Sequence, residues 1–171
     1  MLYSLSLKQV KTYVFAVVFT AGNLLLPFVI HHIPPMFAGV NNGLVWLPIY
    51  FFTLIAAYKF GLQVGLLTAV LSPILNSLIF GMPMMESLPA ILTKSVLLAV
   101  AASFFARKFG KVSLLAIFLA IISYQIIGTG VELILKDFNL AAAAVDFRYG
   151  ILGMLLQLFG GYAVLKTWKN F

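Results

Sequence analysis

The fold is decided by residues 12–58, TYVFAVVFTAGNLLLPFVIHHIPPMFAGVNNGLVWLPIYFFTLIAAY, which contain no charged side chain over 47 residues when histidine is counted as neutral. A helix needs about 20 apolar residues to cross a bilayer, so this run is too long for one crossing and suits two. Its middle, HHIPPMFAGVNNG (residues 31–43), contains the Pro, Gly and Asn residues that interrupt helices. The stretch therefore predicts two transmembrane helices joined by an irregular loop.

The composition of the whole chain points to the same class of protein. Of its 171 residues, 63% are hydrophobic and 9% are charged, whereas soluble domains are about 45–50% apolar and about one quarter charged. The chain is thus too apolar for a soluble or disordered protein, and its length leaves no room for a complete ATPase or a Rossmann domain. It contains no cysteine, which excludes a disulfide framework and thiolate metal ligands within this chain.

Charges and helix breakers divide the rest of the chain in the same way. We predict an all-α integral membrane protein in which one domain, residues 1–171, forms a compact bundle of six transmembrane helices. Their approximate bounds are 12–30, 43–59, 61–80, 86–106, 112–135 and 148–166. Because six is an even number, we expect both termini on the same side of the membrane.

The basic residues predict which side that is. Cytoplasmic loops of membrane proteins are enriched in Lys and Arg, so we expect cytoplasmic N- and C-termini. Only Lys136 and Arg148 then lie in an outer loop, and the inner side has Lys8, Lys11, Lys59, Arg107, Lys108, Lys111, Lys166 and Lys169. This topology accounts for the net charge of +7, and we expect no nucleic-acid partner. The acids are all predicted at the outer side: Glu86, Glu132, Asp137 and Asp146.

Lys94 is the most informative single residue because it lies inside the predicted span 86–106. A lysine within the membrane costs roughly 2.5–3.5 kcal/mol on insertion scales, so it needs a partner or a wet environment. One interpretation is a side chain that extends to the outer headgroups. The other is a cation in an outward-facing cavity.

The span 112–135 offers a counterpart to Lys94. Gln125, Thr129 and Glu132 follow an i, i+4, i+7 spacing and therefore share one helix face. A Lys94–Glu132 pair could be a structural ion pair, or both groups could bind a polar ligand. Polar residues of other spans, Asn76 and Tyr149, are also expected in the outer half. We predict that a solute pocket there is formed by Lys94, Glu132, Thr129, Gln125, Asn76 and Tyr149.

Neither metal binding nor catalysis is predicted. Adjacent side chains such as His31 and His32 point in different directions on a regular element, so they are poor bidentate ligands. His32 is instead expected to contact or gate a ligand in the outer loop. The sequence contains no recognisable catalytic constellation, so we do not expect an enzyme.

Several short motifs follow one another between the first and fourth predicted spans: HIP (residues 32–34), LP (47–48), YKFGLQVG (58–65), LSP (71–73), GMP (81–83) and LP (88–89). In this order and spacing they resemble the substrate-binding S components of energy-coupling factor (ECF) transporters, which take up vitamins. The resemblance implies a binding subunit in the cytoplasmic membrane of a bacterium or archaeon. The C-terminal third of the chain matches that family only in hydropathy.

The resemblance also implies partners. An S component captures a scarce micronutrient at the outer face and associates with a transmembrane T component and two cytoplasmic ATPases, so ATP is used by the partners and no cofactor is expected in this chain. Many relatives have a Glu followed by Tyr-Gly in the fourth span, where this chain has Lys94, Ser95 and Val96. A lysine there suggests a substrate with an anionic group. The family's Ala-x-x-x-Ala step for docking the T component is approximated by Ala16 and Thr20.

Two other readings compete with this one. A small six-span scaffold protein, such as an MreD-like cell-shape subunit, would need no ligand, and its polar groups would serve helix packing. A small membrane enzyme is the third reading, for which a nucleophile or metal set is missing from the sequence. Substitution of Lys94 separates the first two, because a binding protein should lose its ligand while a scaffold should lose stability or its partner.

Overall fold

The computed structural model describes residues 2, 4–37 and 39–168, and the secondary structure of this part of the chain consists of helices joined by loops, without strands. Four helices are long and apolar enough to cross a membrane, with mean hydropathies between 1.7 and 2.1. They are α1 (Val10–His31), α4 (Leu62–Phe80), α5 (Leu88–Phe109) and α6 (Leu114–Leu135). These helices indicate a protein embedded in a membrane.

Two shorter apolar segments, Pro48–Phe60 and Ile151–Thr167, lie where the second and sixth spans are predicted. The first consists of η1 (Pro48–Tyr50) and α3 (Phe51–Phe60), and the second of α9 (Ile151–Leu155), the π-helical turn η2 (Leu156–Gly160) and α10 (Gly161–Thr167). At about 1.5 Å per residue, the first segment is about 20 Å long, short of a bilayer core of about 30 Å. Six crossings therefore remain a prediction.

A break at Leu47 explains why the second predicted span is not one continuous helix. The short helix α2 (Asn42–Trp46) ends at Leu47, which has a left-handed backbone (φ 45°, ψ 46°). The following residue is Pro48, and a proline disfavours the right-handed helical region for the residue before it. A Cβ added at Gly153 of α9 would lie 2.5 Å from the backbone of Trp46. The break thus lies against α9, which approaches it through a glycine.

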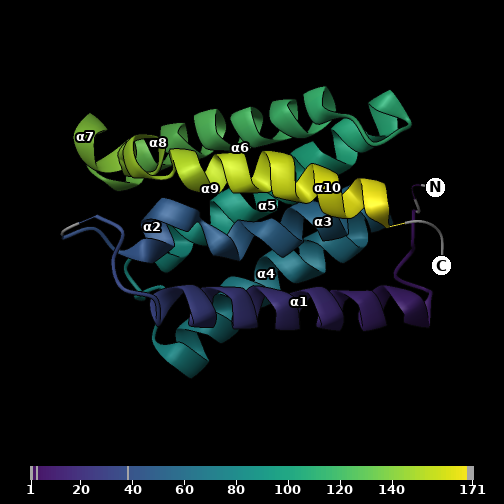
Figure 1. The fold of residues 1–171 in the computed structure, drawn as a ribbon, viewed down its shortest axis with the longest axis horizontal. Coiled ribbons are helices and arrows are strands. Elements are labelled where there is room, and N and C mark those ends of the chain that lie inside the picture. Colours follow the sequence, from purple (N-terminus) through teal and green to yellow (C-terminus); the bar gives the residue numbers. More distant parts are fainter. Residues whose placement is uncertain (1, 3, 38, 169–171) are drawn as a thin grey trace.

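The interior of the bundle centres on α5, which packs against α6, α4 and α3 (Figure 1). Its inward face includes Ala99 and Ala102, which are fully buried. Helices α3 and α4 pack closely at Gly65 of α4, because a Cβ added there would lie 2.4 Å from the Cβ of Ala57 on α3. Small residues at such positions let helix backbones approach each other within a membrane.

Both ends of the described chain lie at the same end of the bundle. The backbone N–H of Leu5 donates to the carbonyl of Phe60 at 3.1 Å, and the Lys59 ammonium donates to the carbonyl of Trp168 at 3.1 Å. Figure 1 shows the two chain ends together, with α2, α7 (Leu140–Ala143) and α8 (Val145–Tyr149) at the opposite end. Segments from α1 to α10 therefore run back and forth between two distinct ends.

The remaining helix bounds differ from the sequence prediction at identifiable residues. The ends of the four long helices lie within three residues of the predicted bounds 12–30, 61–80, 86–106 and 112–135: α1 is longer, α4 and α6 begin later, and α5 is shifted toward the C-terminus. The sixth span, predicted at 148–166, is instead preceded by the separate helix α8 and begins after Gly150. A Cβ at Gly150 would meet the side chain of Leu47 at 2.7 Å, so this turn packs against the break after α2.

Candidate functional site

Three charged side chains from three helices meet near the outer end of the predicted topology. The Lys94 ammonium, on α5, donates to Glu132 Oε2 on α6 at 2.5 Å and to Asp146 Oδ2 on α8 at 2.6 Å. The Lys94 side chain is 1% exposed, and those of Glu132 and Asp146 are 14% and 13% exposed. We call these three residues the charge triad. They bury two negative charges and one positive charge.

The position of Lys94 depends on a glycine in the facing helix. A Cβ at Gly128 would lie 2.5 Å from Lys94 Cγ and 3.1 Å from its Cε. The lysine stem therefore lies directly along α6, and the ammonium reaches Glu132 one turn further on. No side chain larger than glycine fits at residue 128 without moving Lys94.

Several buried polar atoms beside the triad have no hydrogen-bond partner. Both amide atoms of Gln125 are unpaired, as are Thr129 Oγ1 and Gln157 Nε2. Gln125 and Gln157 are fully buried. Buried polar atoms in proteins are nearly always paired with protein or ordered water, so unpaired ones mark places where water or a ligand supplies the partner. Gln125, Thr129 and Glu132 share a face of α6 with Gly128, which contacts Lys94.

Two buried tyrosines lie next to these groups. The Tyr124 hydroxyl donates to Gln157 Oε1 at 3.2 Å. Its ring centre lies 5.3 Å from that of Tyr50, and Tyr50 is within electrostatic range of Glu132 and Asp146. Gln157 belongs to the π-helical turn η2, and such turns often occur at functional sites. The triad thus continues into a polar region that includes aromatic rings.

Asn76 belongs to a different group of polar side chains. Its amide nitrogen donates to the carbonyls of Asn23 and Ser72, at 2.8 and 2.9 Å. The Asn23 amide in turn donates to Thr53 and to Ser72, at 3.0 and 3.1 Å, and its oxygen accepts from the Phe52 N–H at 3.1 Å. This network pairs its buried groups internally and joins α1, α3 and α4.

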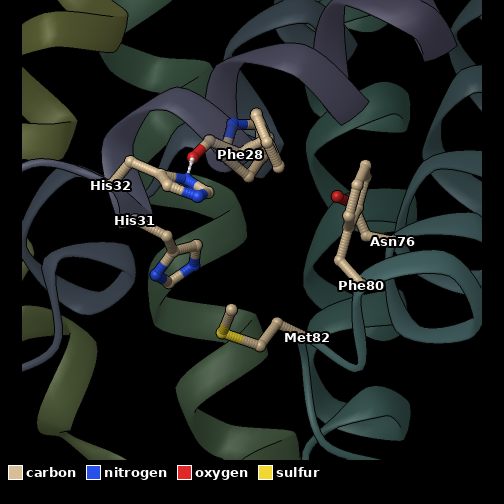
Figure 2. Close-up of a pocket in the computed structure, with 7 residues that line it drawn as sticks. Phe28, His31, His32, Asn76, Phe80 and Met82 are labelled. Carbon is tan, nitrogen blue, oxygen red and sulfur yellow. Dashed lines mark hydrogen bonds between the residues drawn. The ribbon is translucent and has the colours of Figure 1, made fainter.

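Asn76 also lines a pocket of about 160 Å³ between the ends of α1 and α4. Figure 2 shows His31 and His32 on one side of this pocket and Asn76 and Phe80 on the other. His32 Nδ1 lies 2.7 Å from the carbonyl of Phe28, and because a carbonyl can only accept, the ring N–H is the donor. The space is small compared with the 300–1,000 Å³ or so of typical small-molecule pockets.

The structure therefore divides the residues of the predicted site. It brings together Lys94 and Glu132, with Gln125 and Thr129 on the same side of α6. In the part of the chain that the structure describes, no hydrogen bond or ion pair connects Asn76 or His32 to the charge triad. These two residues line the pocket between α1 and α4 instead.

Tyr149 and the predicted docking step are also placed by the structure. Tyr149 is half-buried on α8, and the Arg148 guanidinium lies 5.2 Å from its ring centre. Ala16 and Thr20 are 2% and 4% exposed on the inward side of α1. In this structure they pack inside the bundle, whereas docking of a partner through their step requires an exposed surface.

Asp146, Tyr50 and Tyr124 are site residues that sequence reasoning missed. The sequence places Asp146 only among the acids of the outer side, because a predicted span and a loop of unknown path separate it from Lys94. Counting hydrogen-bond donors could have found it, since a single Glu leaves a buried lysine with one partner for three N–H donors. Among residues 2, 4–37 and 39–168, no three His, Asp or Glu side chains are grouped so as to hold a metal ion.

Comparison of the chain with known protein families, with curated proteins and with solved structures finds no match.

Proposed function

We propose that this protein is a membrane-embedded solute-binding subunit that captures a water-soluble vitamin or a related micronutrient at the outer face. The observation that carries the proposal is the charge triad beside the unpaired polar atoms of Gln125, Thr129 and Gln157. A protein that only needed a stable bundle would gain more from apolar packing than from a buried ion pair.

The contrast with the Asn23 network supports this interpretation. In that network the buried Asn23 amide uses both of its N–H donors and its oxygen accepts a hydrogen bond, as expected for polar groups that hold helices together. Beside the triad, in contrast, Gln125 has both amide atoms unpaired while fully buried. A solute with polar groups would supply the missing partners, because leaving such atoms unpaired costs about 1–3 kcal/mol each.

The motif resemblance extends the proposal to a transport system. We take the protein to be an S component of an ECF transporter that works with a T component and two cytoplasmic ATPases, crosses the cytoplasmic membrane six times and has both termini inside. ATP would then be hydrolysed by the partners and not by this chain. The buried positions of Ala16 and Thr20 mean that the T component would dock on another part of the exposed membrane surface.

The scaffold reading, an MreD-like protein without a ligand, is favoured by one observation. The Asn23 network joins three helices and leaves none of its fully buried side-chain atoms unpaired, so part of the buried polarity is structural. That reading leaves the partners of Gln125 and Gln157 unexplained, and we therefore give it second place.

Mass spectrometry of small molecules released from the purified protein tests the proposal. We expect one metabolite, near one molecule per chain, from the wild type and from Thr93→Val, a neighbouring half-buried position outside the triad. We expect none from a variant with Lys94→Met, Glu132→Gln and Asp146→Asn, which removes all three charges at similar volume. A folded wild-type protein that releases no metabolite would favour the scaffold reading.

A further inference from the structure

The charge of the triad indicates which solutes it can bind. With both carboxyl groups ionised, Glu132 and Asp146 contribute two negative charges against the one positive charge of Lys94, so the ion pairs leave one negative charge uncompensated. Lys136 interacts electrostatically with Glu132, but it is exposed, and water and salt screen its charge. An uncompensated charge in a partly buried site is costly, and a bound cation would neutralise it.

The arrangement of the three side chains has a direction. Lys94 is buried behind the two carboxylates, with 1% of its side chain exposed, whereas Glu132 and Asp146 retain 14% and 13%. A solute that enters from the open side therefore meets carboxylate oxygens before it can reach the ammonium. Coulomb forces at this entrance attract a cation and repel an anion.

The carboxylates also have free acceptor capacity. Lys94 bonds to Glu132 Oε2 and to Asp146 Oδ2. In the described part of the chain, no hydrogen bond engages Glu132 Oε1 or Asp146 Oδ1. An ionised carboxylate accepts hydrogen bonds at both oxygens, and an ammonium group has up to three N–H donors. An ammonium group therefore has enough donors to serve both remaining oxygens.

We propose that the solute bound at this site carries a protonated amine, which bridges Glu132 and Asp146 on the side opposite Lys94. This inference rests on the proposed function. It differs from the expectation drawn from the sequence, because the group of the solute that the site recognises is cationic and not anionic. Lys94 then fixes the spacing of the two carboxylates, and the polar atoms of Gln125, Thr129 and Gln157 bind the rest of the solute.

Two small ions of similar size and opposite charge test the inference. The melting temperature of the purified protein is measured with ethylammonium chloride and with sodium propionate, against sodium chloride at the same ionic strength. At near-saturating concentration we expect ethylammonium to raise it by about 2–4 °C and propionate to leave it unchanged.

Asp146→Asn is the decisive variant, because it leaves the Lys94–Glu132 ion pair in place with no net charge. We expect it to fold and to lose the ethylammonium shift. Asp137→Asn, the same substitution at an exposed acid between α6 and α7, is the matched control and should keep the full shift. Should Asp146→Asn fail to fold, Glu132→Gln serves as the second variant with the same expected loss.

The outcomes separate this inference from the proposed function. A shift with ethylammonium that depends on Asp146 supports the inference. A shift with propionate, an ethylammonium shift that survives in Asp146→Asn, or no ethylammonium shift in the wild type overturns it. In each of these cases a released metabolite found by mass spectrometry would still establish a solute-binding protein, whereas absence of that metabolite would refute the proposed function itself.

Discussion

At the scale of single residues, Lys94 and its two carboxylate partners are the core of the candidate site. Each of the three side chains is individually unfavourable in the interior of a helix bundle, and together they compensate each other only in part. Their near contacts of 2.5 and 2.6 Å tie α5 to α6 and α8. The triad is therefore both a structural joint and the most polar part of the candidate site.

Removal of Lys94 alone should be strongly destabilising. In Lys94→Met, two carboxylates face each other without the cation, and loss of one partner of a buried ion pair typically costs about 3–5 kcal/mol. We expect a fall of the melting temperature in detergent by about 10 °C or more. The variant that also contains Glu132→Gln and Asp146→Asn should recover much of this loss. An equal loss in both variants would contradict the charge-balance explanation.

A second prediction at this scale concerns Asn23. Asn23→Ala removes the acceptor of the Phe52 N–H and the donor to Thr53 and Ser72. We expect a loss of about 1–3 kcal/mol, measured as a lower melting temperature. Asn139→Ala, at an exposed asparagine that caps only the four-residue helix α7, is the control and should change little. Because the Asn23 network is structural, solute release should be unaffected by either change in folded protein.

At the scale of helices, single glycines decide how closely elements approach. Gly128 accommodates the stem of Lys94, whereas a Cβ at Gly130, two residues later, would contact nothing within 4 Å. The two positions are on the same helix and differ in what they face. They form a matched pair for testing whether the location of the lysine stem matters.

We predict that Gly128→Ala displaces Lys94 and weakens solute retention at least tenfold, because the added Cβ would lie 2.5 Å from Lys94 Cγ. Gly130→Ala should retain the solute at the wild-type level and gain helix propensity worth about 1 kcal/mol or less. The measurement is the amount of metabolite per chain after purification of each variant. Equal retention in the two variants would show that the solute does not depend on the position of Lys94.

The helices were easier to predict from the sequence than the candidate site was, and particular residues show why. Long apolar runs gave α1, α4, α5 and α6 with small errors at their ends, and Pro27 and Pro73 are accommodated inside α1 and α4. The break at Leu47 depends on local backbone geometry before Pro48, and the π-helical turn at Gln157 depends on packing. The sequence indicates Lys94 and Glu132 as partners because a lysine within the membrane needs a counterpart and the span 112–135 offers this acid. Asn76 and His32 lie elsewhere because depth alone does not tell which side of a helix meets which neighbour.

At the scale of the whole molecule, the question is how often the chain crosses the membrane. Four helices are long enough to do so, and two shorter apolar segments also run through the bundle. Both ends of the described chain meet at the end of α3. This arrangement is compatible with six crossings and cytoplasmic termini, and the two ends of the first short segment, Pro48 and Phe60, are buried in the bundle.

Because the chain contains no cysteine, single cysteines can report this topology in intact cells. Six crossings predict that a membrane-impermeant maleimide labels Met84→Cys and Asp137→Cys and does not label Gln9→Cys or Lys108→Cys until the membrane is opened. All four positions are exposed in the structure. If only the four long helices cross, Met84→Cys and Asp137→Cys would be shielded and Lys108→Cys labelled.

A solute bound at the charge triad would appear as an added mass in native mass spectrometry of the intact protein. We expect a wild-type chain that carries one added small-molecule mass. In the variant with Lys94→Met, Glu132→Gln and Asp146→Asn, we expect a folded chain at its bare mass. A bare wild-type chain, or an added mass that persists unchanged in the folded triple variant, would show that no solute binds at the triad.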